Sequence, residues 1–179
     1  MELALPLLLV RLIIGLGFAA HGTQKLFGWF GGYGLAGTGG YFESIGFKPG
    51  RFFAFAAGFS ELAGGLLIAL GLGGPIGAMF VIAAMLVAIV AVHLRNGFFA
   101  QNNGVELPLL YLLVAVYYGF AGFGPLSLDA ALGLNGVWTP ALDWVFVALG
   151  FIGGFANLAV RRKTVPAAPA ASEGLDPAV

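Results

Sequence analysis

The residues of this sequence that could most readily perform chemistry are charged side chains inside apolar segments. Arg11 lies in the first long apolar stretch, Glu61 lies in the second, and His21 follows Arg11 on the first. A charge at the centre of a bilayer costs about 2.5 to 3.5 kcal/mol on insertion scales unless it is paired or hydrated. Charges in such positions are therefore candidates for an ion pair, a proton path or a ligand site.

The spacing of these residues along their helices predicts that they approach one another. With a rise of about 1.5 Å per residue, Arg11 lies about 21 Å and Glu61 about 14 Å from the same membrane face. Helix tilt and the long Arg stem can close the difference of about 7 Å, so we expect Arg11 to pair with Glu61 and His21 to approach the pair.

A carboxylate beside a guanidinium and an imidazole has the chemistry of a proton relay or of a site for a quinone headgroup. Redox chemistry at a quinone oxygen needs a proton donor or acceptor within hydrogen-bond reach. Glu61, Arg11 and His21 are therefore the candidate catalytic residues. The alternative is that Arg11 and Glu61 form a neutral structural pair that fixes the register of two helices.

A wider set of polar residues near the same face predicts where a cofactor would bind. These candidates are Glu61, His21, Lys25 and His93. A quinone is the cofactor that fits them. Haem held by His21 and His93 is disfavoured, because histidines at helix ends more often cap carbonyls or meet headgroups. No metal is predicted, because the chain has no cysteine and no clustered spacing of histidines and carboxylates.

The composition places these residues in a membrane protein. Of the 179 residues, 60% are hydrophobic and only 9% are charged, and the mean hydropathy is +0.97. A soluble domain carries about 25% charged residues. Eight basic and eight acidic residues give a net charge of zero, which excludes the basic surface that nucleic-acid binding needs. The absence of cysteine excludes thiol and iron–sulfur chemistry by this chain alone.

The hydrophobic pattern predicts an all-α, polytopic membrane helix bundle with a four-helix core and a fifth C-terminal transmembrane helix. The expected spans are about 3–26, 52–72, 76–94, 107–123 and 140–160. A cleaved signal peptide is the alternative for the first span, but no basic segment precedes it. Residues 1–163 form the predicted bundle, and the Pro- and Ala-rich residues 164–179 are expected to be a disordered cytoplasmic tail.

The distribution of basic residues predicts the orientation of the bundle. With five spans, all Lys and Arg outside the spans fall on one side of the membrane, which the positive-inside rule makes the cytoplasm. The N-terminus is then outside and the C-terminus is cytoplasmic. The basic residues concerned are Lys25, Lys48, Arg51, Arg95, Arg161, Arg162 and Lys163.

The glycine-rich loop after the first span contains a misleading motif. Gly32, Gly34 and Gly37 match the dinucleotide-binding pattern G-x-G-x-x-G, but no β-strand precedes them. The aromatic residues of this loop instead suit the headgroup boundary of a bilayer. Residues 38–46 are expected to form a short interfacial helix, because their apolar residues recur at helical spacing.

Several ordered motifs resemble those of the DoxX family of small bacterial membrane proteins, over roughly residues 7–132. The motifs are His21-Gly22-x-x-Lys25-Leu26, FGWFGGYGLAGT followed by YFESIGF, Glu61-x-x-Gly64-Gly65, His93-Leu94-Arg95-Asn96-Gly97-Phe98-Phe99, Glu106-x-Pro108 and Ser127-Leu128-Asp129. The family takes its name from a subunit linked to quinone-dependent thiosulfate oxidation, and its members typically have four helices. The resemblance therefore implies quinone-linked redox chemistry in the bacterial plasma membrane.

Two hypotheses of function follow from the residues and the resemblance together. In the first, the chain is a subunit of a quinone-linked membrane oxidoreductase system, and a soluble redox partner binds at the cytoplasmic loops. In the second, the chain is a non-enzymatic membrane scaffold or a carrier of a small lipophilic solute. Whether the chain is itself an enzyme stays open, and an oligomer is compatible with either hypothesis.

Overall fold

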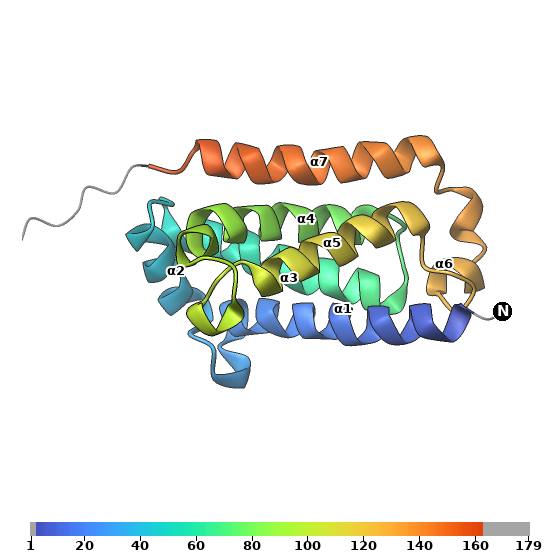
Figure 1. Ribbon diagram of the computed structural model, residues 1–179, viewed down its shortest axis with the longest axis horizontal. Coiled ribbons are helices and arrows are strands. Elements are labelled where there is room, and N and C mark those ends of the chain that lie inside the picture. The colour runs from blue at the N-terminus through green and yellow to red at the C-terminus, as the bar shows by residue number, and fades with distance from the viewer. Residues whose placement is uncertain (1–2, 163–179) are drawn as a thin grey trace, which may run out of the picture.

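In the computed structural model, residues 3–162 are described, and they form helices and loops with no β-strand among them. Five long helices run side by side along the bundle, with α2 at one end and α6 at the other (Figure 1). The helices are α1 (Ala4–Phe27), α2 (Gly34–Ser44), α3 (Gly50–Leu70), α4 (Ile76–Ala88), α5 (Glu106–Ala121), α6 (Leu128–Ala131) and α7 (Pro140–Ala159). The prediction of an all-α helix bundle is confirmed.

Four helices of the described residues are long and apolar enough to cross a membrane. They are Ala4–Phe27, Gly50–Leu70, Ile76–Asn96 and Pro140–Ala159. The apolar helix α5 has 16 residues, or about 24 Å, which is shorter than the hydrocarbon core of about 30 Å. The expected count of five spans therefore stays a prediction. The tail expected at residues 164–179 lies outside the described residues.

The ends of the long helices follow from local sequence signals. Thr139 caps α7, since its side chain accepts a hydrogen bond from the backbone N–H of Leu142, and Pro140 occupies the first turn. The helix α3 ends at Gly71, which adopts a left-handed conformation with φ of 65°. The chain then turns through Gly73, Gly74 and Pro75 into α4.

A seam of glycines joins α1 to α3. A Cβ atom on Gly15 would lie 2.6 Å from the carbonyl oxygen of Gly65, and one on Gly22 would lie 2.6 Å from that of Gly58. Small residues allow this close approach of two helices in lipid. Because the two backbones are in contact, the seam fixes which residues of α1 lie beside which residues of α3.

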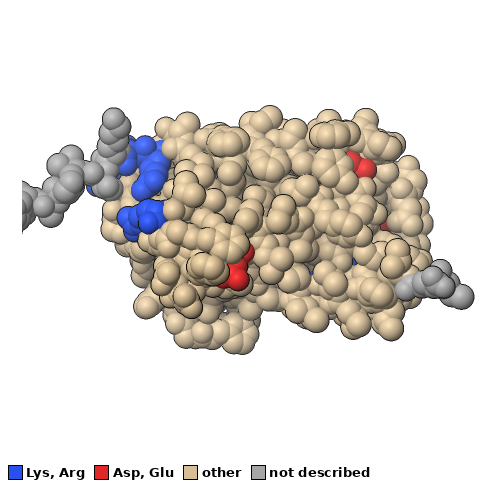
Figure 2. Space-filling model, viewed as in Figure 1, with Lys and Arg blue, Asp and Glu red and all other residues tan. Residues whose placement is uncertain are grey.

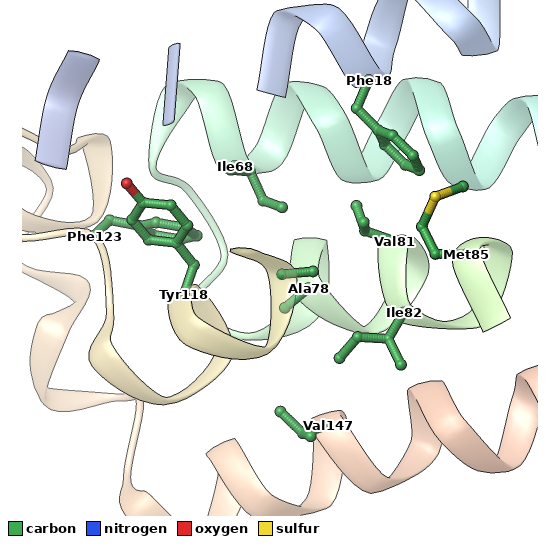
Figure 3. Close-up of a cluster of buried hydrophobic side chains, with 10 residues drawn as sticks. Phe18, Ile68, Ala78, Val81, Ile82, Met85, Tyr118, Phe123 and Val147 are labelled. Atoms are coloured by element: carbon green, nitrogen blue, oxygen red, sulfur yellow. The ribbon is translucent and has the colours of Figure 1, made fainter. Parts of the chain in front are cut away.

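Two apolar clusters fill the bundle. The larger cluster joins α1, α3, α4, α5 and α7 (Figure 3). It contains Phe18, Ile68, Ala78, Val81, Ile82, Met85, Ala115, Tyr118, Phe123 and Val147. The smaller cluster, Ile45, Phe47 and Ala91, lies beside α2 near the end of α4.

The helix α2 begins earlier than expected. The sequence predicted a helix over residues 38–46, whereas α2 spans Gly34–Ser44. The difference arises from packing, because Gly39 and Gly50 let α2 lie against the start of α3, and the Glu43 carboxylate accepts the backbone N–H of Gly50 at 3.0 Å. With no strand in residues 3–162, the G-x-G-x-x-G pattern is a chance match.

Candidate functional site

A buried ion pair between α1 and α3 forms the centre of the candidate site. The side chain of Glu61 is 5% exposed, and its Oε2 atom lies 2.5 Å from Nζ of Lys25, whose side chain is 27% exposed. The glycine seam sets this contact, since a Cβ on Gly58 would lie 3.2 Å from the Lys25 Cβ. Lys25 therefore neutralises the carboxylate that the sequence places inside the second span.

The expected pairing of Arg11 with Glu61 is wrong. Arg11 is buried near the opposite end of the bundle, where its guanidinium lies against Gly71 and donates a hydrogen bond to the carbonyl oxygen of Leu126. The antiparallel packing of α1 on α3 places the end of α1, with Lys25, beside Glu61 instead. Arg11 is therefore not part of the candidate site.

His93 reaches the site from the end of α4, where residues Ile89–His93 form a π-helical turn. Such turns are rare and are frequently found at functional sites. The Nδ1 atom of His93 lies 2.8 Å from the backbone carbonyl oxygen of Asn103. Because a carbonyl can only accept, Nδ1 carries the proton, which leaves Nε2 free to exchange a proton with a ligand.

His21 lies on α1 at a more exposed position. Its Nδ1 atom lies 3.0 Å from Oε1 of Gln24, and its ring meets that of Tyr111 edge to face at 6.1 Å between centroids. The amide oxygen of Gln24 accepts this hydrogen bond, so Nε2 of His21 is the ring nitrogen left to bind or exchange a proton.

A cavity of about 260 Å³ brings four of the predicted residues together, and we call it the headgroup cavity. His21, Lys25, Glu61 and His93 all contribute to its wall. The complete lining is Phe18, His21, Lys25, Glu61, Met85, Ala88, His93, Asn103, Leu107, Pro108 and Tyr111. The four candidate cofactor-binding residues, taken from separate positions in the sequence, therefore surround one space.

Tyr111 and Asn103 are the polar lining residues that the sequence did not single out. Tyr111 lies on α5, and its ring also packs on Phe18 at 5.2 Å between centroids. The sequence feature that could have identified Tyr111 is its phenol inside an apolar helix, because a buried hydroxyl usually needs a polar partner. Asn103 adopts a left-handed conformation with φ of 59°, which turns the loop before α5 back over His93.

The opposite end of the bundle is held together by backbone hydrogen bonds. The buried carboxylate of Asp129 accepts the N–H groups of Gly73 and Gly74 at 2.9 and 2.7 Å. Ser127 caps α6 through its hydroxyl. The Ser127-Leu128-Asp129 motif thus ties α6 to the turn between α3 and α4, which is a structural role.

One further cavity borders the site, and another lies at the opposite end of the bundle. A surface cavity of about 620 Å³ lies beneath the glycine-rich loop, and Gln24, Lys25, Tyr33 and Tyr41 are among its lining residues. Another of about 320 Å³ lies at the far end, beside Asp129. Within residues 3–162, no three His, Asp or Glu side chains gather closely enough to hold a metal ion.

Comparison with known proteins identifies the family. The family model of DoxX matches residues 6–94, which include Lys25, Glu61 and His93. A Haemophilus influenzae protein is 33% identical over 123 residues, or 67% of this chain and 85% of that protein. This chain belongs to the DoxX family. Four helices of its described residues are long and apolar enough to cross a membrane.

Other relatives of this DoxX protein carry more informative names. "Putative oxidoreductase CatD" of Bacillus subtilis is 32% identical over 122 residues, which are 68% of this chain and 83% of the relative. An uncharacterized membrane protein of Mycobacterium tuberculosis is 32% identical over 133 residues, which are 69% of this chain and 78% of the relative. No solved structure matches the chain. This DoxX protein is therefore a membrane protein that resides in a lipid bilayer.

Proposed function

We propose that this DoxX protein is a subunit of a quinone-linked membrane oxidoreductase system and binds the quinone ring in the headgroup cavity. The observation that carries the proposal is the buried Lys25–Glu61 pair in a cavity that His21, His93 and Tyr111 also line. The name of the Bacillus subtilis relative supports an oxidoreductase system. The apolar walls of Phe18, Met85 and Leu107 suit the faces of a ring.

The residues of the cavity fit a quinone because they supply hydrogen-bond donors to its two oxygens. Lys25 donates from Nζ, Tyr111 donates from its hydroxyl, and His93 exchanges a proton through Nε2. Reduction of a quinone to a quinol takes up two electrons and two protons. The residues hold and deliver the protons, and a soluble reductase partner at the basic end supplies the electrons.

The proposed orientation places this basic end in the cytoplasm of a bacterial cell. Lys and Arg side chains gather at the end of the molecule where α2 and the end of α7 lie (Figure 2). Arg161 and Arg162 contact the residues that follow α2. Nε of Arg161 donates to the carbonyl oxygen of Ile45 at 2.7 Å, and the backbone N–H of Arg162 donates to that of Gly46 at 2.9 Å. The positive-inside rule then puts the N-terminus outside the plasma membrane.

The first experiment is to identify the lipophilic molecules bound to the full-length protein. The protein is purified in mild detergent, its visible spectrum is recorded, and its extract is analysed by mass spectrometry. We expect about one quinone per chain in the wild type. We expect its loss in Glu61→Gln, because this variant removes the carboxylate that pairs with Lys25 in the headgroup cavity. Glu106→Gln is the matched control, since Glu106 lies at the start of α5 and does not line the cavity.

Other outcomes of this experiment favour the alternatives. A Soret band would indicate haem bound by His21 and His93 rather than a quinone. A well-folded wild type without a bound quinone would contradict the proposal. A Glu61→Gln variant that keeps its quinone would also contradict it. A different lipophilic solute in the extract would support the carrier hypothesis, and none at all would support the scaffold hypothesis.

A further inference from the structure

A second cavity lies directly beside the headgroup cavity, between α2, α3, α4 and α7. Its volume is about 200 Å³, and we call it the tail cavity. The two cavities share four lining residues: Lys25, Glu61, Ala88 and His93. The ion pair and His93 therefore form the boundary between two adjacent spaces.

The walls of the tail cavity differ in chemistry from those of the headgroup cavity. Away from the shared boundary, the tail cavity is lined mainly by phenylalanine, alanine and valine. These residues are Phe42, Phe47, Phe53, Ala56, Ala57, Ala83, Ala84, Val87 and Val92, and Tyr41, Ser60 and Asn157 complete the lining. The headgroup cavity instead presents two imidazoles, a phenol and an amide around the ion pair. A ligand that fits both spaces has a polar end and an apolar end.

We propose that the tail cavity binds the apolar substituent of the same quinone whose ring occupies the headgroup cavity. This inference rests on the proposed function and deepens it by naming the class of substrate. The substrate is a membrane quinone with an alkyl or isoprenoid chain, and the chain starts at the Lys25–Glu61 boundary. A small water-soluble quinone would leave the tail cavity without an occupant.

The dimensions of the cavities support one ligand that extends through both. Ligand sites in proteins typically have volumes of about 300 to 1,000 Å³. At about 260 and 200 Å³, each cavity alone is smaller than this range. The two adjoining cavities reach the typical volume of a ligand site only if one molecule occupies both of them.

The aromatic walls of the tail cavity pack against one another. The rings of Phe42 and Phe47 lie 5.7 Å apart between centroids, and those of Phe47 and Phe53 lie 5.3 Å apart. Phe47 is completely buried, and the guanidinium of Arg161 lies 5.9 Å from the centre of its ring. Rings that already pack on one another lose less side-chain freedom when an apolar chain binds beside them than exposed rings would.

Packing decides the affinity of the tail, because the chain of a membrane quinone is already in lipid before it binds. The hydrophobic effect contributes little to such a transfer, and van der Waals contact within the cavity contributes the selectivity. Ala57 on α3 and Ala84 on α4 both line the cavity. A phenylalanine at either position fills the space that the chain would occupy.

The test compares two probes on full-length protein in phosphatidylcholine nanodiscs. One probe is 2,3-dimethoxy-5-methyl-1,4-benzoquinone, and the other is the same ring with a decyl chain. Affinities are expressed per lipid, because the decyl probe partitions into the bilayer. We expect Ala84→Phe and Ala57→Phe each to weaken binding of the decyl probe about tenfold and to leave binding of the bare ring unchanged. Ala148→Phe, on an exposed position of α7, is the matched control and should bind both probes as the wild type does.

The outcomes separate a failure of this inference from a failure of the proposed function. If the wild type binds neither probe, the proposed function is wrong and the inference falls with it. If both probes bind the wild type and the two variants weaken them equally or not at all, only the tail cavity is wrong.

A crosslinking measurement keeps the inference testable if the variants do not fold. A decyl probe with a diazirine at the chain end is photolysed on the wild type, and the labelled peptides are mapped. We expect label within residues 42–57 and 83–92. Label confined to exposed residues of α7 and α5 would overturn the inference.

Discussion

At the scale of single residues, the candidate site depends on a buried glutamate paired with a partly exposed lysine. The Glu61 residue as a whole is 4% exposed, so burying its negative charge would be costly without Lys25. Replacing one member leaves the other charge without its partner, whereas replacing both leaves two neutral side chains of similar size. This difference separates the energetic role of the pair from any role in proton transfer.

A double-mutant cycle tests the pair directly. We expect Glu61→Gln and Lys25→Met each to lower the stability by about 1 to 3 kcal/mol, because Lys25 keeps part of its hydration. The double variant should recover most of this loss. Thermal unfolding in detergent, followed by circular dichroism, gives the four Tm values. Losses that simply add in the double variant would show that the two side chains do not interact.

Asp129 carries a second residue-scale prediction, at the opposite end of the bundle. Asp129→Ala leaves the N–H groups of Gly73 and Gly74 without acceptors, at a cost of about 2 kcal/mol or more. Asp129→Asn keeps one acceptor and should lose less. Both variants are compared by Tm with Asp143→Asn, which removes a charge at the start of α7. Equal Tm values for all three variants would contradict the structural role of Asp129.

At the scale of helices, the glycine seam between α1 and α3 decides which side chains meet. Gly22 against Gly58 places Lys25 beside Glu61, while Arg11 is carried toward Gly71. The two helices cannot slide along each other without forcing backbone atoms together. The seam is thus the element that assembles the site, although it contributes no chemistry.

Two Gly→Ala substitutions measure the seam. A Cβ on Gly65 would lie 2.5 Å from the carbonyl oxygen of Gly15, whereas one on Gly153 of α7 would meet only Ala83, at 3.8 Å. We expect Gly65→Ala to lower the Tm markedly and to weaken quinone retention. Gly153→Ala should be neutral or stabilising by up to about 1 kcal/mol, because alanine favours a helix. The same loss of Tm in both variants would mean that the seam has no special role.

The sequence predicted the helices and most of the site, and the failures have physical causes. The apolar runs defined the long helices within a few residues, and His21, Lys25, Glu61 and His93, predicted as a set, line one cavity. Distances along helix axes gave Arg11 as the partner of Glu61, because they assume the depth at which each helix starts. The packing of Gly22 on Gly58 sets a different register, which places Arg11 beside Gly71. Tyr111 was missed for a related reason, since only packing shows that α5 faces the histidines.

At the scale of the whole molecule, the two ends of the bundle differ in charge and in role. The end with α2 carries the surface cluster of Lys and Arg and the headgroup cavity, and the other end is closed by α6 and the Asp129 hydrogen bonds (Figures 1 and 2). In the described residues, the start of α1 and the end of α7 lie at opposite ends. The proposed reductase partner therefore has one chemically distinct end to recognise.

Cysteine labelling tests the proposed orientation of these ends. Because the chain has no cysteine, single variants give an unambiguous signal. We expect Leu132→Cys, on an exposed position beside α6, to react with a membrane-impermeant maleimide in intact cells. Ser44→Cys, at the end of α2, should react only after the cells are opened. The reverse pattern would show that the basic end faces outward.

Lys25 borders the headgroup cavity, the tail cavity and the surface cavity beneath the glycine-rich loop. One four-carbon side chain therefore stands between the carboxylate of Glu61 and the aqueous boundary. A change of rotamer involves one side chain, whereas collective helix motions take microseconds to milliseconds. Under the proposed function, rotation of Lys25 alone would connect the buried carboxylate to the surface cavity, without any helix having to move.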